Sequence, residues 1–136
     1  MICKYLQLHI YNCQTHPGGA VALDLFFKSK TKLRIIAVYL SLTNMHKCNE
    51  TQNTIITWIQ QAQQLNLHPI LLGDFNTHDD INSSSSKFRL INYLRQSNMF
   101  DLGAHVDNKH HTWSNNISQS RIDYIWTDSF NIQFFL

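Results

Sequence analysis

The 136-residue sequence contains no run of about 18 consecutive apolar residues, the length that a membrane-spanning helix requires. Its first residues lack the charged region and the long apolar stretch of a secretory signal peptide. It has only three cysteines, an odd number at unrelated spacings, which argues against a disulfide framework. These absences favour an intracellular protein with reduced thiols, and we count the nucleus among its candidate compartments.

Two of the cysteines lie near histidines, in the patterns Cys13-x-x-His16 and His46-x-Cys48. A zinc site is an alternative interpretation of these residues, although structural zinc sites usually have tighter paired spacing flanked by turns. The net charge of +2 permits binding to nucleic acid without indicating it. The length and the 43% hydrophobic content predict one small domain, residues 1–136.

The hydrophobic pattern predicts an α/β protein. The stretch 33–40 is almost entirely apolar, which is typical of a strand buried on both faces. A short polar connection joins it to 20–27, so we expect these two strands to be antiparallel. Together the elements favour an α/β layered sandwich. We expect further strands at 5–10, 70–72, 110–113 and 121–126, helices at 51–67 and 87–98, and polar loops or turns at 41–50, 81–86 and 114–120.

A carboxylate and an amide follow the apolar run in the stretch "PILLGDFNTH". Side chains alternate along a strand, so we expect Asp74 and Asn76 to face one side and Phe75 to point into the core. Such a pair suits phosphoryl chemistry, because the carboxylate can orient or deprotonate a water and the amide can donate to phosphate oxygens. The alternative is an ordinary turn, since Asp and Asn both bond to their own backbone in tight loops.

Two further residues support the chemical interpretation. Tyr39 lies near the end of the predicted strand 33–40, where its hydroxyl could donate to a phosphate oxygen or its ring could cap the core. Asp123 lies between apolar residues of a predicted strand, where a charge is costly without a partner. That partner is either a histidine whose orientation the acid fixes or, more simply, Arg121.

The motifs "RIIAVYL", "LLGDFN", "HTW" and "SRIDYIW", in this order between about residues 18 and 126, resemble the endonuclease/exonuclease/phosphatase superfamily. The closest resemblance is to the endonuclease domains of non-LTR (LINE-type) retrotransposons. It implies a partial four-layer α/β sandwich of the deoxyribonuclease I-like type, with mixed, mostly antiparallel sheets flanked by helices. It also implies phosphodiester cleavage that depends on Mg²⁺, with Mn²⁺ as a possible substitute.

The resemblance assigns a role to each of the four candidate residues. Asp74 is similar to the acid that positions or deprotonates the attacking water, and Asn76 to the amide that contacts the scissile phosphate. Tyr39 is similar to the tyrosine that lies on the phosphate, and Asp123 to the acid that orients the catalytic histidine. Asp74 and Asn76 are also the candidate metal ligands.

The superfamily pattern also includes a metal-binding glutamate ahead of 20–27 and a final Ser-Asp-His motif after the Asp123 strand. Glu50 is the only glutamate in the sequence, and it lies in the predicted loop 41–50. The histidines of the second half lie at other strand ends: His78, His105, His110 and His111. We therefore expect the chain to be the middle of a nuclease domain, truncated at both ends.

Two functional interpretations follow. The first is a metal-dependent phosphodiesterase that hydrolyses nucleic acid, most of all DNA, with little activity in the isolated chain. The second is a catalytically inactive remnant of a retroelement endonuclease that at most binds nucleic acid. The candidate nucleic-acid-binding residues are the cations Arg34, Lys87, Arg89, Arg95 and Lys109.

Overall fold

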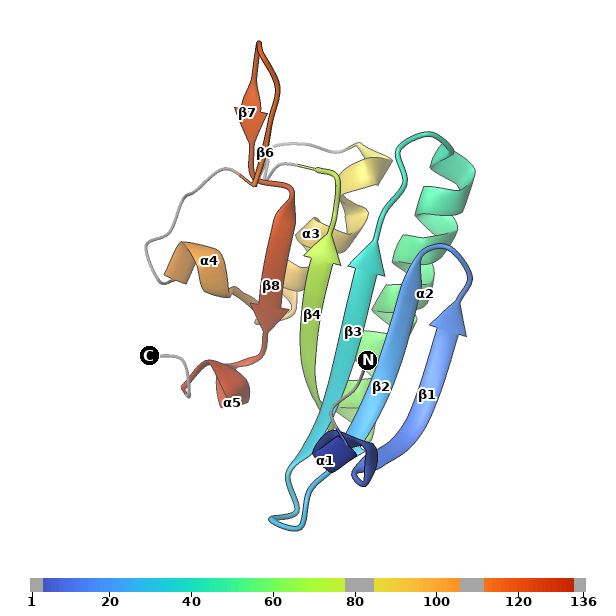
Figure 1. The fold of residues 1–136 in the computed structure, drawn as a ribbon, viewed down its shortest axis with the longest axis vertical. Helices are drawn as coiled ribbons and strands as arrows, with labels where there is room; N and C mark the ends of the chain where they lie inside the picture. The colour runs from blue at the N-terminus through green and yellow to red at the C-terminus, as the bar shows by residue number, and fades with distance from the viewer. Residues whose placement is uncertain (1–3, 78–84, 106–111, 134–136) are drawn as a thin grey trace.

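The computed structural model describes residues 4–77, 85–105 and 112–133, which form one large sheet, a small hairpin and helices (Figure 1). The sheet contains β1 (Ile10–His16), β2 (Ala20–Phe26), β3 (Lys32–Tyr39), β4 (His68–Asp74), β5 (Phe100–Asp101) and β8 (Asp123–Thr127). The hairpin consists of β6 (Trp113–Ser114) and β7 (Gln119–Ser120). The helices are α1 (Lys4–Gln7), α2 (Met45–Gln64), the 3-10 helix η1 (Ser86–Phe88), α3 (Arg89–Gln96), α4 (Leu102–His105) and α5 (Ser129–Ile132).

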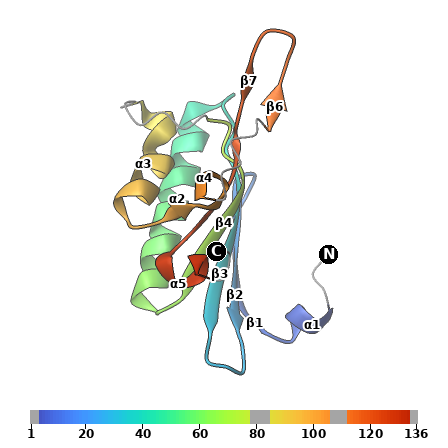
Figure 2. The ribbon, with the colours of Figure 1, turned by 90° about the vertical axis from the view of Figure 1, so that its left-hand side faces the viewer.

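The six strands of the sheet lie in the order β1-β2-β3-β4-β8-β5. Only β3 and β4 are parallel, and α2 connects them, while every other neighbouring pair is antiparallel. Helices α2 and α3 lie on one face of the sheet (Figure 2). The predicted α/β class, with a mixed and mostly antiparallel sheet flanked by helices, is confirmed. None of the described helices is both long and apolar enough to cross a membrane.

The hydrophobic core lies between the sheet and α2 and α3. Ile36 of β3 and Leu71 of β4 are register partners and are fully buried there. Phe75, which follows β4, is also fully buried, as the alternation along "LLGDFN" predicts. Burial of each such side chain contributes about 1.5–3 kcal/mol, so these contacts fix the position of the end of β4.

The opposite face of the sheet is open over its centre. Val21, Leu72 and Ile125 are 39%, 39% and 47% exposed, and Leu72 and Ile125 are register partners on β4 and β8. Ala37 and Tyr39 of β3 are exposed on the same face. The prediction of a β3 strand buried on both faces is therefore wrong, because the apolar run covers a face that the described residues do not pack against.

Several element boundaries differ from the prediction. Helix α2 begins at Met45 because the Asn44 side chain accepts a hydrogen bond from the Lys47 amide and caps it, so polar residues assigned to a loop form its first turns. The segment predicted as a strand at 5–10 contains α1, and the exposed edge strand β1 follows it. The predicted turn 114–120 contains β7, which pairs with β6, while β8 pairs with β4 in the large sheet.

A buried ion pair joins β2, β3 and α2. Arg34 Nε and Nη2 donate to the two carboxylate oxygens of Asp24 at 2.6 and 2.7 Å, and Nη1 donates to the Trp58 carbonyl oxygen at 2.8 Å. Arg34 is only 1% exposed. Its predicted role in binding nucleic acid is therefore wrong, because its guanidinium is enclosed beneath α2 and committed to Asp24.

Candidate active site

Three of the predicted site residues lie side by side at one end of the sheet. Tyr39, the last residue of β3, is the register partner of Asp74, the last residue of β4. Asp74 is in turn the register partner of Asp123, the first residue of β8. Register partners point to the same face of a sheet, here the open face, so the phenol and the two carboxylates converge on one surface.

Gly73 explains how β4 reaches this position. Its φ is +140°, and a Cβ atom at this residue would lie 2.1 Å from the carbonyl oxygen of Val38. Only glycine permits so close an approach of β4 to β3 with this backbone conformation. The glycine of "GDFN" therefore places Asp74 beside Tyr39.

Asp74 forms the turn interaction that the sequence offered as an alternative, and it does so in a partly buried position. Its Oδ1 accepts a hydrogen bond from the Asn76 amide at 2.8 Å, which is the turn interaction of an ordinary Asp-containing loop. Its pKa is nevertheless raised above the ordinary value by burial, opposed by the bond from Asn76 and reinforced by the negative charge of Asp123. The carboxylate thus sits in an environment that disfavours its own negative charge.

The orientation of Asn76 has a different structural cause from the one predicted. Strand β4 ends at Asp74, and Asn76 has a left-handed backbone with φ +50°, so the alternation of a strand does not orient it. Its Nδ2 donates to the Leu40 carbonyl oxygen at 2.6 Å and ties the segment after β4 to the segment after β3. Because Nδ2 has a second hydrogen, this bond leaves a donor for a phosphate oxygen.

Asp123 is exposed at the start of β8 rather than enclosed within an apolar strand. Thr112 Oγ1 accepts hydrogen bonds from the amides of Ile122 and Asp123 at 3.0 and 3.1 Å and fixes this strand start. The alternative in which Arg121 neutralises Asp123 is wrong, because Arg121 forms an ion pair with Asp101.

Asp74 and Asp123 differ from the other carboxylates of the described residues. Asp24 and Asp101 pair with arginines, and Asp128 and Glu50 lie within ion-pair distance of His68 and His46. In residues 4–77, 85–105 and 112–133, no cationic side chain lies within ion-pair distance of Asp74 or Asp123. Within the described part of the chain, these two neighbouring acids therefore have no compensating cation, an arrangement that favours the binding of a cation beside them.

Two residues with positioning roles escaped the sequence-based prediction. The buried Tyr124 hydroxyl lies 3.0 Å from the Thr77 carbonyl oxygen and 2.9 Å from that of Arg121, so it joins the segment after β4 to the segment before β8. Thr112 acts on Asp123 as described above. Both occur in the motifs "HTW" and "SRIDYIW", which were the available signal.

A hollow of about 420 Å³ beside Asp123 is lined by Leu72, Gly73, Asp101, Gly103, Thr112, Arg121, Asp123, Tyr124 and Ile125.

The remaining predicted cations are scattered. Arg89 is exposed on α3 and donates to Asn53 Oδ1 at 2.7 Å, while Lys87 lies over the ring of Phe88. Arg95 is partly buried, and burial lowers its pKa. Lys87 lies on η1 and Arg89 and Arg95 lie on α3, whereas Arg34 is buried on β3. Lys109 and the histidines His78, His110 and His111 lie outside the described residues, as does the side chain of His105.

The candidate zinc residues do not form a site within the described part of the chain. Cys13 is exposed on β1, whereas Cys48 is a buried residue in the first turn of α2. His16 lies within hydrogen-bond distance of Thr54 Oγ1. Among the described residues, no three side chains of His, Cys, Asp or Glu gather as potential metal ligands.

Residues 33–133 match a family model described as endonuclease-reverse transcriptase. The chain belongs to this family. This match confirms the resemblance of the four motifs to the endonuclease/exonuclease/phosphatase superfamily. The match covers β3, β4 and β8, the strands that carry the candidate site. A comparison with curated proteins gives no match.

Three solved structures illustrate the similarity of fold. The human Nocturnin catalytic domain has a TM-score of 0.64 and 18% identity over 90% of this chain and 50% of its own. The endonuclease domain of TRAS1, a telomere-specific non-LTR retrotransposon, has a TM-score of 0.59 and 12% identity over 90% and 57%. The Neisseria 3′ phosphatase NExo, bound to a product DNA hairpin, has a TM-score of 0.64 and 16% identity over 89% and 59%. The chain thus spans about half the length of the structures it matches.

Proposed function

We propose that the chain carries part of the active site of a metal-dependent phosphodiesterase that hydrolyses nucleic acid, with DNA as the main substrate. The observation that supports this proposal is the uncompensated pair of Asp74 and Asp123, with Tyr39 beside it. Two facing carboxylates are unfavourable unless a cation or a proton neutralises them. A phosphodiester brought to such a site needs the same positive charge, because phosphate and carboxylates repel each other.

The donor set is suited to a divalent metal. Members of this superfamily generally use divalent metals, and Mg²⁺ is often held by one or two carboxylates together with substrate phosphates. Asp74 and Asp123 would supply the carboxylates here, with Mg²⁺ as the expected ion and Mn²⁺ as a substitute. When bound, the metal supplies stabilisation of negative charge on the phosphate and the leaving oxygen.

The surrounding side chains have complementary tasks in this proposal. The hydroxyl of Tyr39, a residue that is 53% exposed, donates a hydrogen bond to a phosphate oxygen. The second hydrogen of Asn76 Nδ2 does the same from the other side of Asp74. Asp74, which holds the metal in this proposal, also orients the attacking water beside the phosphate.

Nicking of supercoiled plasmid tests this function. We expect slow nicking by the purified chain that requires Mg²⁺ or Mn²⁺ and is lost in Asp74→Asn and Asp123→Asn. Glu50→Gln, which removes an exposed acid on α2, is the matched control and should leave nicking unchanged. Nicking that persists with a chelator present, or in Asp74→Asn, would overturn the proposed site.

The second candidate function is nucleic-acid binding without cleavage, as a remnant of a retroelement endonuclease. Its support is that Glu50, the only glutamate, lies on α2 with an exposed side chain rather than at the end of β4. In the same experiment, this function predicts no nicking at any metal concentration, together with retarded migration of DNA in a gel. Absence of both nicking and retardation would contradict both candidates.

A further inference from the structure

The end of the sheet opposite to the two acids contains a large hollow with aromatic walls. It lies between α1 and the turn that connects β2 to β3, and its volume is about 820 Å³. Figure 1 shows α1 and this turn at the end of the sheet remote from the β6-β7 hairpin. The length of β3 separates the two ends by roughly 23 Å. We call this space the turn-end hollow.

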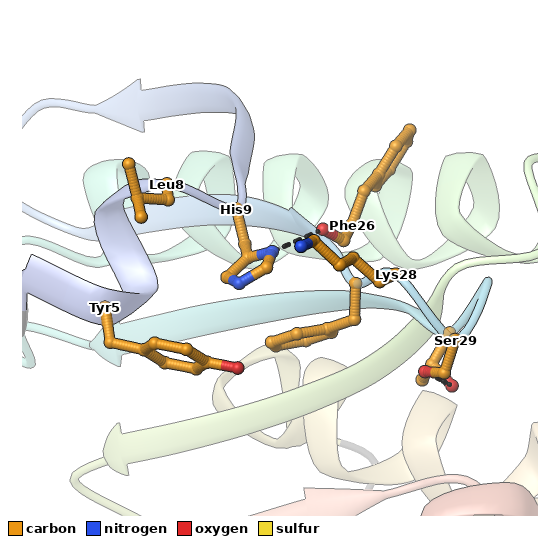
Figure 3. Close-up of a pocket in the computed structure, with 8 residues that line it drawn as sticks. Tyr5, Leu8, His9, Phe26, Lys28 and Ser29 are labelled. Atoms are coloured by element: carbon orange, nitrogen blue, oxygen red, sulfur yellow. Dashed lines mark hydrogen bonds between the residues drawn. The ribbon is translucent and has the colours of Figure 1, made fainter.

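The aromatic wall of the hollow consists of the rings of Tyr5, His9 and Phe27, and hydrogen bonds fix His9 within it. The ring of His9 lies 5.2 Å from that of Tyr5 and 5.0 Å from that of Phe27, measured between centroids. His9 Nδ1 lies 3.1 Å from the Phe26 carbonyl oxygen, to which it donates, and the Phe26 amide donates to the His9 carbonyl oxygen at 2.9 Å. Figure 3 shows the side chains of Tyr5, His9 and Lys28 pointing toward a common space. His9 is therefore held by two hydrogen bonds to Phe26, and the Tyr5 and Phe27 rings lie beside it.

An aromatic and an aliphatic side chain are exposed at the rim of the hollow. Tyr5 is 67% exposed and Leu8 is 84% exposed. Exposed apolar side chains grouped around a hollow are a common feature of binding sites. A planar, partly apolar ligand would cover the ring of Tyr5 and enter the space beside His9.

The charge at this end is positive. Lys28 and Lys30 lie in the turn, and Lys32 begins β3. The turn is fixed by hydrogen bonds between the backbones of Phe27 and residues 30 and 31. Asp24 is the only acid among residues 1–49, and it is buried against Arg34. Among the described residues, none of these three lysines forms an ion pair.

We propose that the turn-end hollow binds an unpaired base of a single-stranded nucleic acid, with Lys28 and Lys30 contacting the adjoining phosphates. Aromatic rings beside flexible cations match the alternation of base and phosphate in a single strand. A duplex keeps its bases stacked inside and cannot present one to the hollow. This site is separate from the acids at the other end of the sheet and does not rest on the proposed hydrolysis.

Fluorescence anisotropy of a labelled oligothymidine tests the proposal with the full chain. We expect the single strand to bind more tightly than a duplex of equal length. Tyr5→Ala should weaken binding roughly fivefold or more, since that is the loss associated with one stacked base. The control is Leu65→Ala, because Leu65 is 57% exposed at the end of α2 and does not line the hollow.

The salt dependence separates stacking from phosphate contact. Lys28→Gln should reduce the slope of log K against log salt concentration by about 0.7, the value for one phosphate on a single strand. Tyr5→Ala should leave this slope unchanged, and Lys47→Gln on α2 should change neither slope nor affinity. Asp74→Asn should not weaken binding, which distinguishes this site from the proposed active site.

Several results would overturn the proposal. They are an absence of oligothymidine binding, an equal loss of affinity in Tyr5→Ala and Leu65→Ala, and tighter binding to duplex than to single strand. Binding to anionic lipid vesicles that depends on Tyr5 and is not displaced by oligothymidine would assign the hollow to a membrane surface instead. Circular dichroism of each variant confirms that the fold is retained.

Discussion

The carboxylates of Asp24 and Asp74 lie on the same sheet but in opposite electrostatic situations. Asp24, beneath α2, receives two hydrogen bonds from Arg34. Asp74, at the end of β4, has another acid as its register partner. Within the described residues, a cation thus neutralises the buried acid, whereas none pairs with Asp74 or Asp123 at the end of β4 and β8. A cost in stability at one surface, with compensation elsewhere, is typical of functional sites.

We expect the largest effect on stability for the replacement of Asp24, the acid that Arg34 neutralises. Asp24→Ala leaves the buried Arg34 guanidinium without its counter-ion, and we expect the free energy of unfolding to fall by about 3–5 kcal/mol. Urea denaturation measures this loss. The double variant Asp24→Leu with Arg34→Met removes both charges and should recover much of it. A single variant as stable as the parent chain would contradict the assignment of this pair.

Asn76→Ala should be the most destabilising of the changes proposed at the acid end. The variant loses the bond to the Leu40 carbonyl oxygen and places alanine in a left-handed conformation, which together cost about 1–2 kcal/mol. Asn76→Gly tolerates that conformation and loses the side-chain bond alone, so it should be less destabilised. Equal losses of stability in both variants would show that the left-handed backbone at residue 76 does not contribute to the effect. Thermal denaturation followed by circular dichroism provides the comparison.

Tyr124→Phe tests how the two acids are held together. The variant keeps the ring that packs on Phe75 but loses the hydroxyl near the carbonyl oxygens of Thr77 and Arg121. We expect a loss of about 1 kcal/mol. Hydrogen exchange should become faster in the segments around Thr77 and Arg121, and unchanged exchange there would contradict a positioning role.

Asp74→Asn should have the smallest effect on stability, and unlike the other variants it should be slightly more stable than the parent chain. Because the pKa of Asp74 is raised in the folded chain, its ionisation opposes folding, and this cost is present at neutral pH. It disappears as the pH falls below the ordinary value of 3.8, where the carboxyl is protonated in both states. We therefore expect a slightly higher Tm for Asp74→Asn at neutral pH and a vanishing difference at low pH. A lower Tm at neutral pH would show that Asp74 stabilises the fold.

The sequence predicted the strands that carry the candidate site better than it predicted what packs around them. Apolar runs located β2, β3 and β4, and the motifs located Tyr39, Asp74 and Asp123, because strand ends and their polar residues are local features. The pairing of Arg34 with Asp24 joins two strands and a helix, and no local pattern distinguishes such an arginine from an exposed one. The open face of β3 was missed for the same reason, since an apolar run does not reveal what covers it.

The bond from Asn76 to Leu40 and the position of Thr112 also depend on tertiary structure. Asn76 lies 36 residues from Leu40 along the chain, and Thr112 lies 11 residues from Asp123. The sequence indicated that Asn76 is functional but not that a left-handed backbone orients it. The motifs thus supplied the candidate site residues, whereas the structure was needed to identify the residues that hold them in place.

Direct titration with Mn²⁺ is the measurement that tests the central claim, namely that Asp74 and Asp123 form a cation site. Electron paramagnetic resonance of free Mn²⁺ gives the number of ions bound and their affinity without relying on catalysis. We predict one site in the parent chain and in Glu50→Gln, and a loss of this site in Asp74→Asn and in Asp123→Asn. Equal Mn²⁺ binding by all four proteins would contradict the claim.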